Sequence, residues 1–262
     1  MCLIENKEKS RLSCFKLNGS VTFIDNNRYS LRQKIGTLLY SMLTRGGKSI
    51  GEITKIEKRH QALLERFKLN YSQEGCMQPT NILKGMAVMG YFQSEKCFSS
   101  VSEIIKDEFE FLPEITEACI PTTNEIISSE SCCIHIRRGD YLKSPVFGVC
   151  TDKYYVEAIN KIKEMIPNVR FYVFSDDIDS VKDVFGEVLS EETTYIPSSY
   201  SDQESMCLGS KCKHFIISNS TFSWWMQYLS SYENKIVIAP SRWYNDGREC
   251  YIYQNNWILV EP

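Results

Sequence analysis

Three short apolar runs in the second half of the chain each lead directly into a cluster of polar residues. The runs are Cys132–Ile136, Phe171–Phe174 and His214–Ile217. Runs of this length without strong turn formers are typical of buried strands. The clusters that follow them are RRGDY at 137–141, SDD at 175–177 and SNST at 218–221. The pattern therefore predicts three strands that each end beside candidate binding side chains.

Segments with helical spacing separate these runs. One expected helix begins near Thr151 and ends at Pro167, and a second passes through Val181 and Phe185. A third begins at Ser201 with a capping box to Glu204, and a fourth covers Phe222–Leu229. Further strands are predicted at Thr194–Ile196 and Ile236–Ala239. Strands that alternate with helices at this spacing favour a parallel, doubly wound sheet. Ligands bind outside the carboxyl ends of such strands, so we expect the three clusters to converge.

The N-terminal half has a less regular pattern. Apolar residues between Ser30 and Gly46 follow helical spacing and predict an amphipathic helix; they are Leu31, Ile35, Leu38, Leu39, Met42 and Leu43. A strand over Gly85–Phe92 and a helix over Val101–Phe109 are also expected, whereas Ile50–Leu69 fits either a strand and a helix or an exposed excursion.

Prolines and small polar residues over Leu112–Glu130 are typical of a boundary between domains. We therefore divide the chain into an N-terminal lobe, 1–125, and a C-terminal lobe, 126–262.

Composition narrows the class of protein. The chain has 262 residues, of which 43% are hydrophobic, and a formal net charge of −3, so it can bury a core but lacks the basic balance expected of a nucleic-acid-binding protein. It has no apolar run of about 18 residues and no signal peptide, which favours a cytoplasmic protein. The chain has eleven cysteines, an odd number, and most of them lie among apolar residues, so we interpret them as reduced core thiols.

The candidate chemistry is that of an anion site. Arg137 and Arg138 follow one strand, and Ser220 and Thr221 precede a helix, whose first backbone N–H groups bind phosphate well. Alternatively, one of the two arginines forms an ion pair with Asp140 and only fixes the conformation of the loop at 137–141.

Three further residues have open interpretations. His135 is either a satisfied core histidine or a contact to a nucleotide. Asp176 and Asp177 fit a helix cap, a carboxylate that binds a base or ribose, or half of a metal site with Asp179. Trp224 and Trp225 are expected to pack in the core.

At this point the motifs resemble those of a known family. HIRRGDY at 135–141, FSDD at 174–177 and SNSTFSWW at 218–225 closely resemble the three motifs of glycosyltransferase family 11, the bacterial and animal α-1,2-fucosyltransferases. The stretch GYFQSEKCF at 90–98 is also similar to that family.

The resemblance implies a fold, a donor and a set of roles. The fold would be GT-B-like α/β, with a doubly wound, Rossmann-like C-terminal donor lobe and a smaller N-terminal lobe. The donor would be GDP-fucose, used with inversion and without a metal or other cofactor. Carried over to this chain, the motifs place the pyrophosphate at Arg138 and Arg137, the guanosine at His135, Asp176 and Asp177, and further donor contacts at Asn219, Ser220 and Thr221. Asp140 is a candidate for the catalytic base.

One family feature is not found. Family members usually begin with a segment like G-G-L-G-N-Q-M-F-Q-Y-A, and nothing similar occurs between Met1 and Asn70, so we expect an incomplete, truncated acceptor-side lobe. The leading hypothesis is transfer of L-fucose to the 2-hydroxyl of an oligosaccharide or glycolipid-linked galactoside, in the cytoplasm, with peripheral association at the inner face of the membrane left open. The alternatives are a catalytically impaired GDP-sugar-binding relative and a metal-dependent transferase that uses Asp177 and Asp179.

Overall fold

A computed structural model gives the fold and divides the chain into two compact units. It describes residues 2–3, 11–17, 22–23, 29–46, 50–72, 85–90, 92, 94–139, 141, 144–189, 192–247 and 250–262. The first unit comprises Met1–Ser13, Leu17–Asp107 and Glu249–Gln254, and the second comprises Cys14–Lys16, Glu108–Arg248 and Asn255–Pro262. Contacts thus group residues 108–125 with the C-terminal half, whereas the sequence placed them in the lobe 1–125.

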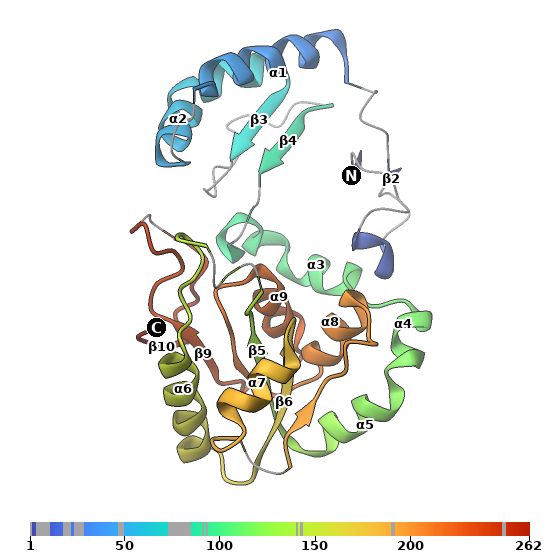
Figure 1. Cartoon of the computed structure of the whole chain (residues 1–262). Helices are drawn as coiled ribbons and strands as arrows, with labels where there is room; N and C mark the ends of the chain where they lie inside the picture. The colour runs from blue at the N-terminus through green and yellow to red at the C-terminus, as the bar shows by residue number, and fades with distance from the viewer. Residues whose placement is uncertain are drawn as a thin grey trace. The chain divides into compact units, whose positions relative to one another are not determined.

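The second unit is built on a parallel sheet of six strands in the order β10-β9-β8-β5-β6-β7 (Figure 1). The strands are β5 Glu130–Ile136, β6 Val169–Ser175, β7 Thr194–Tyr195, β8 His214–Ile216, β9 Val237–Pro240 and β10 Ile258–Val260. All their pairings are parallel. From Ser131 to Ile136, β5 is buried at every position, because it is paired on both sides and covered on both faces.

Helices lie on both faces of this sheet. They are α4 Pro113–Ala118, α5 Ile120–Ser128, α6 Asp152–Met165, α7 Ile178–Phe185, α8 Asp202–Ser210 and α9 Thr221–Leu229. Ile134 of β5 shares a core cluster with Tyr155 of α6 and Phe185 of α7. The next residue along the strand toward the N-terminus, Cys133, contacts Met226 of α9, 3.8 Å between sulfurs. Because successive strand residues point to opposite faces, α6 and α7 cover one face and α9 the other, as the doubly wound prediction requires.

Local signals in the sequence set where several helices begin. Ser201 and Glu204 form the predicted capping box of α8. Thr151 caps α6 by accepting from the backbone N–H of Tyr154 at 3.3 Å. The boundary interpretation of Leu112–Glu130 is wrong in its local structure, because this stretch folds into α4 and α5. Its two prolines lie in the first turns of these helices, where a missing N–H costs nothing.

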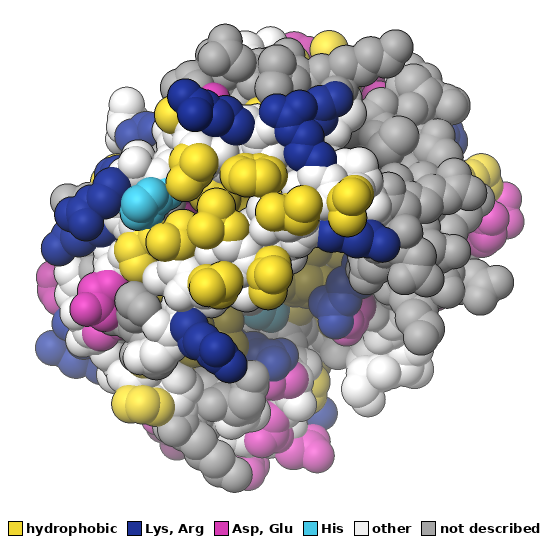
Figure 2. Space-filling view, turned by 90° about the horizontal axis from the view of Figure 1, so that it is seen from above, with side chains coloured by type: hydrophobic (Ala, Val, Ile, Leu, Met, Phe, Trp, Pro, Cys, Tyr) yellow, Lys and Arg dark blue, Asp and Glu magenta, His cyan; other side chains and the backbone are white. Residues whose placement is uncertain are grey.

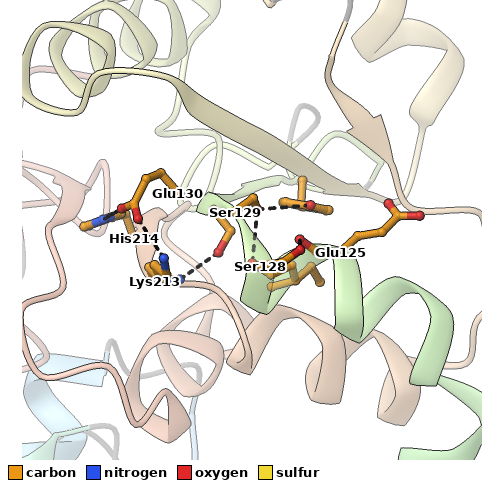
Figure 3. A network of polar contacts seen from close by, with 9 residues as sticks. Glu125, Ser128, Ser129, Glu130, Lys213 and His214 are labelled. Atoms are coloured by element: carbon orange, nitrogen blue, oxygen red, sulfur yellow. Dashed lines mark hydrogen bonds and ion pairs between the residues drawn. The ribbon is translucent and has the colours of Figure 1, made fainter.

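A network of polar contacts links the amino end of β5 to residues of β6 and β8 and to Lys213 (Figure 3). Glu130 accepts from Lys213 Nζ at 2.7 Å and lies 3.8 Å from His214 Nε2. Ser129 Oγ contacts the hydroxyl of Tyr172 at 3.3 Å. The ion pair with Lys213 lowers the pKa of Glu130. These contacts belong to the amino end of the strand, so the opposite, carboxyl end remains for a binding site.

The first unit combines helices with a small sheet. Its elements include β1 Cys2–Leu3, β2 Thr22–Phe23, α1 Leu31–Thr44, α2 Ile50–Arg66, β3 Leu69–Ser72, β4 Ala87–Gly90 and α3 Ser102–Glu108. The undecided segment Ile50–Leu69 is therefore mainly helical. Strands β3 and β4 pair in parallel. Tyr40 of α1 stacks on Tyr71 of β3, with ring centroids 3.6 Å apart, and donates to Glu57 of α2 at 2.8 Å.

The predicted amphipathic helix is confirmed as α1, but of its apolar side chains only Tyr40 belongs to the buried core of this unit. Its buried residues are Gln33, Gly36 and Tyr40. Gly36 is needed there, because a Cβ atom would lie 2.6 Å from both Leu69 and Phe67. Close helix–strand packing thus uses the small and polar side of α1.

The packing of α8 against α9 gives a test of the fold. At Gly209 an added Cβ would meet Met226 Sδ at 2.7 Å, and Met226 is fully buried, whereas Gly51 has no atom within 4 Å of that position. We expect Gly209→Ala to destabilise the protein by about 1–3 kcal/mol and Gly51→Ala, in an exposed helical position, to stabilise it by up to about 1 kcal/mol. Urea unfolding of both variants measures this, and equal stability of the two would contradict the packing.

Candidate functional site

The carboxyl ends of the three central strands lie side by side. Strand register pairs Ile136 of β5 with Ser175 of β6, and Ile134 of β5 with Ile216 of β8. The residues that follow these strands are the three polar clusters singled out in the sequence. Their predicted convergence at one edge of the sheet is therefore confirmed.

Arg138 is the most buried charged residue at this edge. Its side chain is 7% exposed, its Nη1 lies 2.6 Å from Asp152 Oδ1, and its guanidinium packs over the ring of Phe185 at 5.2 Å. The other two guanidinium nitrogens, Nε and Nη2, are buried and have no hydrogen-bond partner. Nε and Nη2 form one edge of the guanidinium, so Arg138 presents a paired set of donors to an oxyanion.

Asp176 braces the loop that carries both arginines. Its carboxylate accepts from the backbone N–H of Arg138 at 2.8 Å and from Arg137 Nη1 at 3.2 Å. Gly139 permits this approach, because a Cβ there would lie 2.5 Å from Asp176 Oδ2. Asp176 therefore fixes the conformation of this loop, and the pairing of an arginine with Asp140 stays a prediction, because Asp140 lies outside the described residues.

Asp177 acts as a helix cap. It accepts from the backbone N–H of Ser180 at 3.1 Å and begins α7, which confirms the capping interpretation for this residue. Across the described part of the chain, no three His, Cys, Asp or Glu side chains are grouped so that they could hold a metal ion. The structure thus gives Asp177 a capping role and gives its partner Asp179 a place in the first turn of the same helix.

His135 joins the first cluster to the third. Its side chain is buried, and Nδ1 lies 2.9 Å from Ser218 Oγ. Burial, and to a smaller extent the nearby charge of Arg137, lower the pKa of His135 to about 3. The ring is therefore neutral at physiological pH. The core-histidine interpretation accounts for this geometry, and a contact to a nucleotide stays a prediction.

The SNST cluster is held by internal hydrogen bonds. Asn219 Nδ2 donates to the carbonyls of Phe147 at 2.9 Å and Trp243 at 3.0 Å. Ser220 caps α9 and accepts from the backbone N–H of Phe222, and Thr221 is the first residue of that helix. Asn219 therefore links three segments around the site, while the donor-binding roles of Asn219, Ser220 and Thr221 stay predictions.

Several residues at this edge were not selected from the sequence. Asp152 follows Thr151, near which a helix was expected to begin, and it is the ion-pair partner of Arg138. Tyr155 donates to the carbonyl of His135 at 3.4 Å, and Tyr154 donates to that of Ile217 at 2.6 Å. Burial raises the pKa of Tyr155 well above its usual value. The only sequence signal for any of these roles was that Asp152 is an acidic residue in the first turn of a predicted helix.

The aromatic and cysteine predictions are confirmed in part, because Trp225 and the thiols of Cys97, Cys150 and Cys250 are only half-buried. Trp224 is buried and stacks on Tyr228, with ring centroids 4.9 Å apart. Cys132, Cys133 and Cys207 are buried thiols outside any disulfide. No helix in the described part of the chain is long and apolar enough to cross a membrane.

Comparison with known proteins identifies relatives of this site and fold. The model of glycosyl transferase family 11 matches residues 76–261. The chain is 28% identical to an alpha-1,2-colitosyltransferase of Escherichia coli over 90% of this chain and 80% of that protein. It is 29% identical to the O-antigen biosynthesis glycosyltransferase WbnK of Escherichia coli over 68% of this chain and 61% of WbnK.

A more distant relative and one solved structure extend this result. A galactoside 2-alpha-L-fucosyltransferase of Caenorhabditis elegans is 26% identical over 56% of this chain, which spans 43% of that enzyme. The crystal structure of fucosyltransferase NodZ from Bradyrhizobium superposes with a TM-score of 0.51 at 15% identity, over 82% of this chain and 74% of NodZ. This likeness concerns the fold and confirms the GT-B-like α/β prediction.

The neutral, buried state of His135 predicts how stability depends on pH. The folded pKa is about 3, whereas an unfolded histidine titrates near 6.5, so below pH 6.5 the unfolded state binds a proton that the folded state does not. Stability is then lost as pH falls, by about 1.4 kcal/mol per pH unit for this residue. We expect denaturant unfolding between pH 7.5 and 4.5 to show a slope that grows as pH falls and reaches this value below about pH 5.5, where His135→Asn should reduce it by about one proton.

Burial also lowers the pKa of His214, so it contributes a slope of the same sign. His214→Asn is the matched variant: it should remove only its own part of the slope. A wild-type stability that stays flat over this range would contradict the assignment of His135.

Proposed function

Because the chain belongs to glycosyl transferase family 11, we propose that it transfers L-fucose from GDP-fucose to the 2-hydroxyl of a galactoside, with inversion at the anomeric carbon. The observation that carries this proposal is the buried edge of Arg138 at the end of β5, with two donors that have no partner. The names of two relatives support the proposed type of glycosidic linkage, since one is an alpha-1,2-colitosyltransferase and the other a galactoside 2-alpha-L-fucosyltransferase.

The proposed role of Arg138 is to bind the pyrophosphate of the donor. A buried N–H group without a partner costs about 1–3 kcal/mol, and two phosphate oxygens on the Nε–Nη2 edge would remove that cost. Asp152 holds the third nitrogen and so fixes the orientation of the guanidinium, while the atoms that cover Nε and Nη2 have to move aside when the phosphate arrives. As the bond to fucose breaks, negative charge grows on the departing GDP, and a fixed guanidinium stabilises that charge.

We further propose that the two adjacent arginines provide the positive charge that a divalent cation supplies in other transferases. Arg137 is partly exposed and is oriented by Asp176, so it can reach the same phosphates from the open side. The guanosine would lie near Asp177, which is exposed and uses Oδ1 for its helix cap, so that Oδ2 can accept from guanine. The acceptor would be an oligosaccharide or a glycolipid-linked galactoside.

A second candidate concerns the sugar rather than the chemistry. The similarity to an alpha-1,2-colitosyltransferase, over 80% of its length, favours GDP-colitose as an alternative donor. A relative that binds the nucleotide sugar without turnover is the remaining alternative, and the assays below separate it from both.

Transfer assays with each donor test the proposal directly. The chain is incubated with lactose and either GDP-fucose or GDP-colitose, with and without EDTA, and the product linkage is read by NMR. We expect an α-1,2-linked product from GDP-fucose at a rate that EDTA leaves unchanged. Loss of turnover on chelation would contradict the arginine-only donor site, and binding of GDP-fucose without any product would identify an impaired relative.

Replacement of Arg138 tests its role in leaving-group stabilisation. We expect Arg138→Ala to lower kcat by about 10²–10³-fold, because removal of one preorganised charged donor has an effect of this size. Arg170→Ala is the matched control, since Arg170 lies at the amino end of β6 and pairs with Glu125 at 3.9 Å. It should keep kcat within about threefold, and an Arg138→Ala enzyme as active as this control would rule out the assigned role.

A further inference from the structure

Helix α1 exposes a continuous apolar stripe. Leu31, Ile35, Leu38 and Met42 are 75%, 49%, 62% and 64% exposed. Their spacings of four, three and four residues place them on one side of the helix, over a length of about 16 Å. The opposite side holds the buried residues of α1, so the stripe points away from the core of its own unit. A helix normally buries its apolar side, which makes this exposure a sign of an interaction surface.

The charges around the stripe are almost all positive. Among the described side chains of α1, its C-cap Arg45 and α2, the exposed basic residues are Arg32, Lys34, Arg45, Lys55, Lys58, Arg59 and Arg66. The only exposed acidic residue in the same set is Glu52. This concentration of positive charge occurs in a chain whose formal net charge is −3. Figure 2 shows the hydrophobic side chains gathered in one patch with Lys and Arg side chains along its edge.

We propose that this face of α1 and α2 binds the surface of an anionic phospholipid membrane. An interfacial helix lies in the plane of the headgroups, with its apolar side chains in the acyl boundary and Lys and Arg beside them. On the helix, Lys34 and Arg45 flank the stripe on one side and Arg32 on the other, so their long side chains can reach the phosphates while the stripe inserts. With 14 residues, α1 is too short to span the membrane, so the association is peripheral.

The charge distribution argues against a second copy of the chain as the occupant. In a symmetric dimer through the stripe the same patch meets itself, so the basic residues that flank it on α1, Arg32, Lys34 and Arg45, would lie near those of the second copy. An anionic surface instead gains from every one of these charges. Lipid is the partner that matches both the apolar stripe and its basic border.

Vesicle binding of the full chain tests the proposal. Sedimentation is compared between vesicles of equal parts phosphatidylglycerol and phosphatidylcholine and vesicles of phosphatidylcholine alone, at low and at raised salt. We expect strong binding only to the anionic vesicles, weakened by salt. Each basic residue near such a surface contributes roughly fivefold to binding, so Arg32→Glu with Lys34→Glu should reduce it at least about 20-fold. Leu38→Ser with Met42→Ser should reduce it at least about tenfold.

Matched controls carry the same changes elsewhere. Ile120 and Ile127 of α5 are 50% and 54% exposed, so Ile120→Ser with Ile127→Ser controls for loss of exposed apolar side chains. Lys106→Glu with Lys211→Glu controls for net charge, since both lysines are exposed. Both controls should bind vesicles as the wild type does, and thermal unfolding of every variant confirms folding.

Three outcomes would overturn the proposal. One is equal binding to both kinds of vesicle, and another is equal loss of binding in the control variants. The third is a dimer in sedimentation velocity, without vesicle binding, that Leu38→Ser with Met42→Ser converts to a monomer. None of these measurements depends on sugar transfer, so their failure is separate from failure of the proposed function.

Discussion

The ion pair between Arg138 and Asp152 is the interaction on which the candidate site depends. A guanidinium with 7% exposure is stable in the interior only when its charge is compensated, because an unpaired buried charge costs several kcal/mol. Asp152 is available because Thr151 begins α6 one residue earlier. Its carboxylate is also favoured in that first turn by the helix dipole. The start of α6 thus decides both the orientation of Arg138 and which of its nitrogens remain for a ligand.

Strand β5 connects this ion pair to the rest of the sheet. Its residues are buried from Ser131 to Ile136, so the position of Arg138 beyond its end is as fixed as the core itself. Tyr154 and Tyr155 of α6 add hydrogen bonds to the ends of the strands, and the contact between His135 and Ser218 joins two of the clusters. These are buried contacts between elements distant in sequence. They explain how a site made of loop residues can be preorganised without a bound ligand.

The sequence was sufficient to predict the alternating strands and helices from β5 to β9 and the edge at which the clusters meet, but not α2, α4 or α5. Strand runs, caps and the order of elements are local signals, and the parallel register then places the strand ends together. The partners within the site were not predictable in the same way. Asp176 binds the loop after β5 from 38 residues away, a pairing that depends on how two loops turn. For the same reason the choice between Asp140, Asp152 and Asp176 as partners of the arginines could not be made from spacing.

Periodicity has a similar limit at α1, where it predicts the apolar side of the helix but not the direction in which that side faces. The direction is decided by internal contacts of the opposite side. Tyr40 donates to Glu57, Gln33 donates to the carbonyl of Gly85, and Gly36 admits the side chains of Phe67 and Leu69. The same packing buries Glu57 and Glu65, which removes two negative charges from the outer surface of α2. One set of polar contacts therefore both holds the helices together and leaves an apolar, basic face outside, so membrane affinity would follow from the way this unit folds.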